Sequence, residues 1–316
     1  MLTTTTSPIS FPGLGLELNP AKDFTLFGGL SVNFYGICIA TGLLLAVLYG
    51  YLRSKEFGIK KDDILDGVLM VVPIAIIFAR LYYCLFKWDL YKADPLSILY
   101  IWEGGLAIYG GVIGAVLGVA LFCLIKKIKL PALLDLVAIG FLIGQCIGRW
   151  GNFFNREAFG AETDSFFRMG LYTYTTSSGD IFAWQDPLGG VANYMDRAQL
   201  HYYHPTFLYE SVWNLAGFVL LHFLSKRRKY DGQIALGYAA WYGLGRTLIE
   251  GLRTDSLYIP GSETLRVSQL LAAATCFAAV VVLLVMMFKK HSPDRLYVNQ
   301  AAAREATLTQ QTEEET

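Results

Sequence analysis

The stretch GQCIGRWGNFFNREAFG, residues 144–160, raises the question on which the fold and the function depend. An apolar run ends at Arg149, and Asn152, Asn155 and Glu157 follow within the next eight residues. A guanidinium, two carboxamides and a carboxylate at the end of an apolar helix are costly in hydrocarbon unless they face a polar cavity or partner. The stretch therefore predicts a polar site at one edge of a membrane.

The composition places the chain among polytopic membrane proteins rather than soluble ones. Hydrophobic residues make up 54% of the chain and charged residues 16%, and the mean hydropathy is +0.42. Apolar stretches long enough to cross about 30 Å of hydrocarbon predict an all-α protein with seven transmembrane helices. They lie at residues 30–52, 64–86, 106–125, 132–148, 206–224, 234–250 and 267–288.

The positions of the basic residues predict the orientation, because Lys and Arg are enriched in cytoplasmic loops. More than half of the 26 Lys and Arg residues follow the first, third, fifth and seventh predicted spans. We therefore expect the N-terminus outside and the C-terminus in the cytoplasm, with Arg149 near the outer surface. No cleavable signal peptide is expected, and the first span is interpreted as an uncleaved anchor.

This topology divides the chain into five parts. We expect an outer N-terminal segment at 1–29, helices one to four at 30–150, a small outer head domain at 151–205, helices five to seven at 206–288, and a cytoplasmic tail at 289–316. In the head domain, TYTTSSGD and QDPLGG are strand and turn signals, although no role is assigned to residues 161–200. The tail segment NQAAAREATLTQ is expected to be partly helical.

Three arginines are not in loops but in the predicted helices or at their ends. At 1.5 Å per residue, Arg80, Arg149 and Arg246 lie roughly 24, 25 and 18 Å from the cytoplasmic starts of their helices, in the outer half of the bilayer. The sixth span places Arg246 and Glu250 one helical turn apart, with Tyr242 and Arg253 on the same stripe. Either the pair is structural and locks two helices together, or the arginine holds an anionic group such as phosphate.

Helix packing is the alternative for the other motifs. In residues 144–160, glycines would let helices approach and Arg149 and Arg156 would snorkel to the interface, but this leaves the amides and Glu157 unexplained. In EGGLAIYGGVIGA, residues 103–115, the glycines form either a packing face or an unwound turn that a ligand can approach: Gly104, Gly105, Gly110, Gly111 and Gly114. In HPTFLYE, residues 204–210, Tyr209 and Glu210 are expected to point inward.

Together these residues predict a pocket in the outer half of the membrane. Three arginines would line it with three carboxylates: Arg80, Arg149, Arg246, Glu157, Glu210 and Glu250. A ligand with an anionic head and apolar tails suits both surroundings, so we expect an anionic phospholipid of the outer leaflet.

The segment GRWGNFFNREAFG resembles the signature of the prolipoprotein diacylglyceryl transferase family, which is close to G-R-x-G-N-F-x-N-x-E-x-x-G. Other blocks of that family resemble this chain in the same order: NFYGICIATG, ARLYYCLF, EGGLAIYGG, HPTFLYE and YGLGRTLIEGLR. The resemblance implies a bacterial cytoplasmic-membrane enzyme. It would transfer the diacylglyceryl group of phosphatidylglycerol to the lipobox cysteine of prolipoprotein signal peptides, release glycerol phosphate, and use no metal or nucleotide.

The resemblance also carries functional residues onto this chain: Tyr35, Arg149, Asn152, Glu157, Gly160, Arg246 and Glu250. We expect Arg149 and Arg246 to hold the phosphate and stabilise the charge that gathers on it, with Asn152 at the glycerol region. Glu157 and Glu250 would orient the arginines, Arg80 would assist, and Glu210, Gly110 and Gly111 would support the site.

One position departs from the family. Some members carry a histidine, a candidate base, where this chain has Tyr109. A tyrosine with a pKa of about 10 is a poor base at neutral pH. Three alternatives stay open: an arginine activates Tyr109, the base lies elsewhere, or the substrate thiol loses its proton on binding near the arginines.

Two other classes of function compete with an enzyme. A transporter would also place arginines and glutamates near broken helices, but the chain has no internal repeat and its polar residues cluster on one side. A structural scaffold would not need so many costly charges in one layer. Nucleic acid is not an expected partner, and the five cysteines lie in apolar segments, where thiols pack as small hydrophobes.

Overall fold

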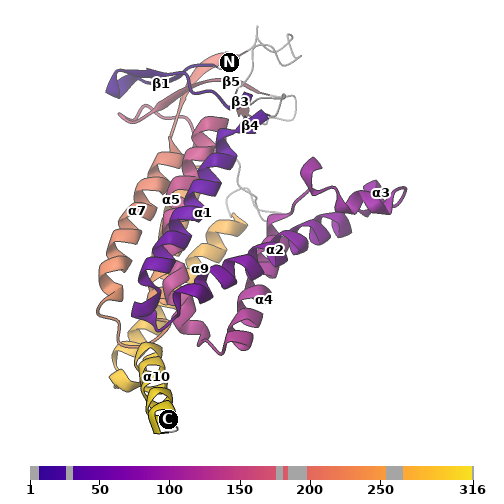
Figure 1. Cartoon of the computed structure of the whole chain (residues 1–316). Coiled ribbons are helices and arrows are strands. Elements are labelled where there is room, and N and C mark those ends of the chain that lie inside the picture. The colour runs from indigo at the N-terminus through magenta and orange to yellow at the C-terminus, as the bar shows by residue number, and fades with distance from the viewer. Residues whose placement is uncertain (1–6, 26–30, 176–180, 184–197, 254–265, 315–316) are drawn as a thin grey trace. The chain divides into compact units, whose positions relative to one another are not determined.

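The computed structural model describes residues 7–25, 31–175, 181–183, 198–253 and 266–314 (Figure 1). The chain forms two compact units. The first comprises residues 1–46, 138–227 and 234–290, and the second comprises 47–137, 228–233 and 291–316.

Each of the seven predicted spans forms a helix. They are α1 (Phe34–Arg53), α2 (Lys61–Phe86), α4 (Ile108–Lys126), α5 (Leu130–Asn155), α7 (Thr206–Ser225), α8 (Gln233–Glu250) and α9 (Val267–Met287). Among the described residues, six helices are long and apolar enough to cross a membrane, and α8 is not one of them. Gln233, Arg246 and Glu250 lower the hydropathy of α8. The fold is therefore that of a polytopic membrane protein with six candidate spans.

Helix α5 is longer than the predicted span, which ended at residue 148. It continues to Asn155, so that Arg149 and Asn152 lie about one turn apart on the helix and not in a loop. Aromatic packing stabilises this extra length: the ring of Phe207 lies 5.0 Å from that of Phe153 and 5.4 Å from that of Trp150, between centroids. The helix thus continues beyond the predicted span, because this aromatic contact stabilises a segment whose polar residues and Gly151 give no apolar signal in the sequence.

Arg156 ends α5 in a left-handed conformation, with a φ of 51°. Its side chain does not snorkel, since the residue is only 2% exposed. The Nη2 group donates to the carbonyl oxygens of Ser7 at 2.7 Å and Pro20 at 3.0 Å, and Nη1 donates to that of Phe154 at 3.1 Å. Burial lowers the pKa of the guanidinium to about 10, so it stays protonated at neutral pH. Arg156 therefore joins the N-terminal segment to the end of α5.

A sheet lies where α1 and α7 begin and α5 ends (Figure 1). Its strand order is β2-β1-β5-β6, and β7 also pairs with β5. The strands are β1 (Ile9–Phe11), β2 (Leu16–Leu18), β5 (Met169–Thr175), β6 (Ile181–Ala183) and β7 (Gln199–Tyr203), all antiparallel where paired. Strands β1 and β2 near the N-terminus thus share a sheet with β5, β6 and β7.

The sheet packs on the end of α5 through a small aromatic core. Its buried members are Ile9, Phe11, Phe153, Phe159, Met169, Leu171, Tyr203 and Phe207. A hairpin of β3 (Asp23–Thr25) and β4 (Ser31–Asn33) leads into α1. The strand signal TYTTSSGD corresponds to the end of β5, whereas residues 176–180 and the turn signal QDPLGG lie outside the described residues.

The second unit is built on the antiparallel pair α2 and α4. Gly110 and Gly114 allow close contact, because a Cβ on Gly110 would lie 2.3 Å from the carbonyl oxygen of Phe78. Short helices connect the pair: α3 (Trp88–Tyr91), η3 (Pro95–Leu99) and η4 (Ile101–Glu103). At the other end, η2 (Ser54–Phe57) and the loop at 228–233 meet the tail, whose helix α10 (Tyr297–Glu314) confirms the prediction of a helical segment.

We expect Arg156→Leu to lower the free energy of unfolding by about 3 kcal/mol, because buried carbonyls lose a charged donor. Arg156→Lys should recover only part of this loss, since an ammonium cannot present the planar fork. Thermal unfolding in detergent measures the effect. Arg168→Leu is the matched control, because its guanidinium donates to the carbonyls of Asp164 and Ser165 at a less buried position. Equal losses in the two arginine-to-leucine variants would contradict the assigned role of Arg156.

Candidate functional site

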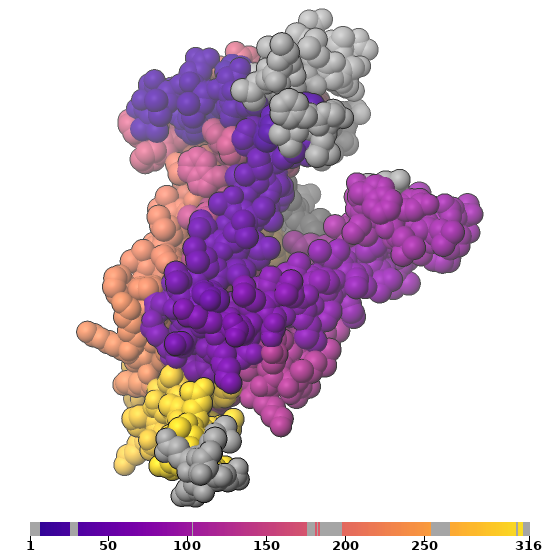
Figure 2. Space-filling model, in the orientation of Figure 1, coloured from indigo at the N-terminus to yellow at the C-terminus, as the bar shows by residue number. Residues whose placement is uncertain are grey.

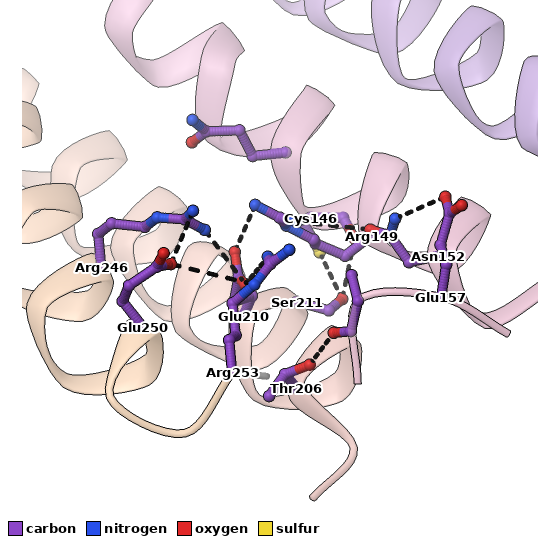
Figure 3. A network of polar contacts seen from close by, with 12 residues as sticks. Cys146, Arg149, Asn152, Glu157, Thr206, Glu210, Ser211, Arg246, Glu250 and Arg253 are labelled. Atoms are coloured by element: carbon purple, nitrogen blue, oxygen red, sulfur yellow. Dashed lines mark hydrogen bonds and ion pairs between the residues drawn. The ribbon is translucent and has the colours of Figure 1, made fainter. Parts of the chain in front are cut away.

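The first unit contains a network of buried charges centred on Glu210 of α7 (Figure 3). One carboxylate oxygen, Oε2, lies 2.5 Å from Nη2 of Arg149 on α5. The other, Oε1, lies 3.7 Å from Nη1 of Arg246 on α8 and 3.4 Å from Nη1 of Arg253, just beyond α8. One carboxylate therefore brings together three arginines from two other segments.

Glu250 forms the second centre of this network. Its Oε2 lies 2.7 Å from Nη2 of Arg246 and 4.0 Å from Nε of Arg253. Its Oε1 accepts a hydrogen bond from the Ser268 hydroxyl at 2.6 Å, and its backbone carbonyl accepts one from the Arg266 guanidinium. The predicted pairing of Arg246 with Glu250 across one helical turn is confirmed. The residues after α8 and the start of α9 hold the pair in place.

The signature stretch extends the network on the other side of Arg149. The Oδ1 atom of Asn152 accepts from Nη1 of Arg149 at 3.4 Å, and Nδ2 of Asn152 donates to Oε1 of Glu157 at 3.0 Å. Asn155 donates to the same carboxylate oxygen at 3.2 Å. Within the described residues Glu157 makes no ion pair, and Asn152 links its carboxylate to Arg149. That Glu157 orients Arg149 stays a prediction.

The two acids are more buried than Arg149 and Arg246, and Arg253 is intermediate, with 10% of its side chain exposed. The side chains of Glu210 and Glu250 are 6% and 3% exposed, whereas those of Arg149 and Arg246 are 22% and 20% exposed. Three arginines and two glutamates leave one formal positive charge in this set of five. The carboxylates thus hold the guanidinium groups from behind, and the accessible surface of the site is cationic. Such a surface suits a phosphate or carboxylate, which a guanidinium contacts through two parallel hydrogen bonds.

Gly160 connects the signature stretch to the two segments that carry the acids. Its amide donates to the carbonyl of His204 at 2.9 Å, and it forms an isolated bridge with Arg253. A Cβ at this position would lie 2.7 Å from Cβ of His204 and 2.8 Å from the carbonyl oxygen of Leu252. Only glycine therefore fits between these chains.

Tyr35, near the start of α1, lies against the signature helix. A Cβ on Gly151 would meet its ring at 2.6 Å, which places Tyr35 beside the turn that carries Arg149 and Asn152. The site residues predicted in the first unit are therefore close to one another in space.

Comparison with known proteins identifies the family. The family model described as prolipoprotein diacylglyceryl transferase matches residues 23–285. The chain belongs to the prolipoprotein diacylglyceryl transferase family. A relative from Listeria welshimeri, named phosphatidylglycerol–prolipoprotein diacylglyceryl transferase, is 40% identical over 84% of this chain and 90% of its own length. Relatives of the same name from Bacillus velezensis and Bacillus cereus are 40% and 41% identical over 89% and 86% of this chain, and over 97% and 93% of their own lengths.

Arg80 belongs to the second unit of this transferase-family chain, where backbone carbonyls surround its guanidinium. Nε donates to Ile98 at 2.8 Å, Nη1 donates to Gly104 and Gly105 at 2.6 and 3.1 Å, and Nη2 donates to Ser97 and Tyr100 at 2.8 and 3.3 Å. A guanidinium has five N–H donors, and five carbonyls accept from it here. We therefore reassign Arg80 from assisting the phosphate to positioning the loop that precedes α4.

The glycines of EGGLAIYGGVIGA divide into two groups. Gly104 and Gly105 have φ values of 88° and 73° and form the non-helical turn whose carbonyls receive Arg80. Gly110 and Gly111 lie inside α4, so the unwound turn expected from the sequence is confined to the first pair. Tyr109 is 64% exposed, and its ring lies 6.4 Å from that of Tyr82 between centroids. No hydrogen bond of its hydroxyl occurs within the described residues, and its role as a base stays a prediction.

Three residues of the network escaped the site prediction. Arg253 lies three residues after Glu250 on the stripe read from the sequence, so its position was available. Ser268 and Arg266 lie at the start of α9, where no motif or charge pattern marks them.

Replacing Glu210 with glutamine should lower the free energy of unfolding by about 3 kcal/mol, because Arg149, Arg246 and Arg253 lose their shared counter-charge in a buried place. Thermal unfolding in detergent measures this loss. Glu162→Gln is the control, since this carboxylate is 61% exposed and its ion-pair partner among the described residues is His201. A Glu210→Gln variant as stable as that control would show that the carboxylate is not needed to hold the arginines.

Gly105→Ala should be destabilising by more than about 1 kcal/mol, because a left-handed alanine is strained and its Cβ would lie 2.5 Å from Nη1 of Arg80. Gly36→Ala in α1 is the control, since a Cβ there meets nothing within 4 Å and alanine favours the helix. The thermal midpoint should fall for Gly105→Ala and stay level or rise for Gly36→Ala. An unchanged midpoint for Gly105→Ala would contradict the positioning role of Arg80.

Proposed function

We propose that this protein transfers the diacylglyceryl group of phosphatidylglycerol to the cysteine thiol of a prolipoprotein lipobox. The membership of the family and the names of relatives that match almost their whole length support this activity. Within the site, the proposal is supported by one observation: Arg149 and Arg246 both contact the carboxylate of Glu210. Two guanidinium groups from different helices are held side by side with their outer faces accessible.

The reaction makes a particular demand on this site. The thiolate sulfur attacks the glycerol carbon that carries the phosphate, the carbon–oxygen bond breaks, and a thioether forms. The leaving glycerol phosphate gains one negative charge, and the thiol proton is lost to a base or to water. The charge that develops is thus on the phosphate, and preorganised cations in a low-dielectric site stabilise it more than they stabilise the bound lipid.

We assign separate tasks to the site residues. Arg149 and Arg246 hold the phosphate, and Glu210 and Glu250 fix their positions and spacing. Asn152, positioned by Glu157, directs its amide towards the glycerol region. Tyr35 borders the same turn of α5, and Gly160 closes the loop that carries Glu157. These are binding and positioning tasks, and the nucleophile belongs to the substrate, so the five free cysteines of this chain are dispensable.

The topology is part of this proposal. Helix α8 crosses the membrane as the seventh span, because its arginine and glutamate are neutralised by the network and not exposed to lipid. The N-terminus lies outside the cytoplasmic membrane of a bacterium and the C-terminus inside. Residues 151–205 then form the outer head, beside which the lipobox peptide and the lipid meet.

Arg149→Ala and Arg246→Ala should each lower the rate of transfer by about 10²-fold or more, since each removes charge stabilisation from the transition state. The measurement is the mass gained by a synthetic lipobox peptide incubated with phosphatidylglycerol and the purified protein in detergent. Arg227→Ala, an exposed arginine after α7, is the matched control and should keep wild-type transfer. Full activity in either site variant, or none in a folded wild type, would overturn the proposal.

The same assay tests the base. Tyr109→Phe removes only the hydroxyl, so a large loss of rate would assign the proton transfer to it. A wild-type rate in Tyr109→Phe would show that this hydroxyl is not the base. The base would then be another group, or the substrate thiol would lose its proton because nearby arginines lower its pKa.

A further inference from the structure

A second cationic groove lies in the other unit, where α4 ends. Its volume is about 390 Å³, within the range of small-ligand sites. The end of α4, the following loop and the first turns of α10 line it: Cys123, Leu124, Lys127, Ile128, Lys129, Tyr297, Gln300 and Arg304. The family match stops at residue 285, so the tail that forms one wall lies beyond it.

The groove carries positive charge. Lys127, Lys129 and Arg304 line it, and no acid is among its lining residues. Lys129 already has partners in the protein, because its Nζ lies 2.8 Å from Oδ2 of Asp231 and 3.1 Å from the carbonyl oxygen of Arg295. Lys127 and Arg304 form no ion pair within the described residues. Two cations are therefore left to face a ligand.

The other wall is apolar and continues into a membrane span. Helix α4 is a candidate span that ends at Lys126, and Leu124 in its last turn is 76% exposed. Cys123 and Ile128 are buried behind it. A soluble anion would gain nothing from this wall, whereas a lipid would place its head at the cations and its chains along α4.

The groove is held in a fixed shape by the docked tail. The amide of Tyr297 donates to Oδ2 of Asp231 at 3.0 Å, and its hydroxyl donates to the carbonyl of Lys127 at 3.4 Å. A Cβ on Gly58 would lie 2.7 Å from Cα of Val298, so the tail backbone is in close contact with the segment after α1. Figure 2 shows this contact as the yellow C-terminal residues against violet residues near position 50.

Lys127 itself adopts a conformation that usually belongs to glycine. It caps α4 with φ 56° and ψ 34°, in the left-handed region where glycine is common and a side chain is unfavourable. Backbone strain of this kind, found at a cation facing a groove, favours a functional interpretation of the residue.

We propose that this groove binds the headgroup of an anionic phospholipid through Lys127 and Arg304. In the proposed topology the lipid belongs to the cytoplasmic leaflet. The site is separate from the arginine network of the first unit, and its occupant is a bound lipid that is not consumed.

The test is native mass spectrometry of the full chain in a non-ionic detergent, titrated with phosphatidylglycerol or with phosphatidylcholine. Lys127→Gly and Arg304→Gln should each weaken binding of phosphatidylglycerol to this groove about five-fold, and the double variant roughly 25-fold. Lys60→Gln, an exposed cation outside the groove, is the control and should bind as wild type. Binding by the double variant equal to that of the control would overturn the proposal.

Two further measurements distinguish an anionic phospholipid from a free phosphate ion and from a lipid without net charge. Millimolar inorganic phosphate should not displace the lipid, and phosphatidylcholine should show no loss in the variants. Displacement by phosphate, or equal losses for both lipids, would overturn the assignment to an anionic phospholipid. Lys127→Gly should also raise the thermal midpoint in lipid-free detergent, because glycine relieves the left-handed strain. If Lys127→Gly binds phosphatidylglycerol more weakly and yet is more stable, the weaker binding is not caused by misfolding. Diacylglyceryl transfer by these variants tests the proposed function independently.

Discussion

The carboxylate of Glu210 is the constraint on which the rest of the site depends. It lies on a membrane helix, almost fully buried, between Arg149, Arg246 and Arg253. Without it, three guanidinium groups would repel one another in a place that water screens poorly. With it, they stay close together and only part of their charge is compensated. The site can therefore be cationic enough to bind a phosphate and still exist inside a membrane protein.

The surrounding structure keeps that arrangement in register. The members of the network come from three helices: α5 supplies Arg149, α7 supplies Glu210, and α8 supplies Arg246 and Glu250. Their spacing is fixed where these elements end. Gly160 fits tightly between residues 204 and 252, and buried Arg156 joins the end of α5 to the N-terminal segment. Several polar side chains of residues 144–160 thus contact the protein itself: Arg156 contacts backbone carbonyls, and Asn155 and Asn152 contact Glu157.

The sequence predicted the helices well because hydrophobic length and basic loops are strong signals in membrane proteins. The helix α8 followed from an apolar stretch, and the Arg246–Glu250 pair from the i, i+4 spacing of a helix. Contacts between distant segments were harder to predict. Nothing in the sequence indicated that Arg156 would be buried on Ser7 and Pro20, that five carbonyls would surround Arg80, or that Ser268 would bond to Glu250. An arginine in an apolar setting signals a partner but does not say whether that partner is a ligand or the protein backbone.

In the proposed site Arg149 and Arg246 act as one phosphate-holding unit joined by Glu210. A double-mutant cycle on the rate of diacylglyceryl transfer tests this coupling, with Arg149→Ala, Arg246→Ala and the double variant compared with wild type. Residues that act as a unit are strongly non-additive. We predict that the double variant loses little more activity than the more damaging single variant. Losses that multiply would contradict the claim, because they would show two arginines acting independently.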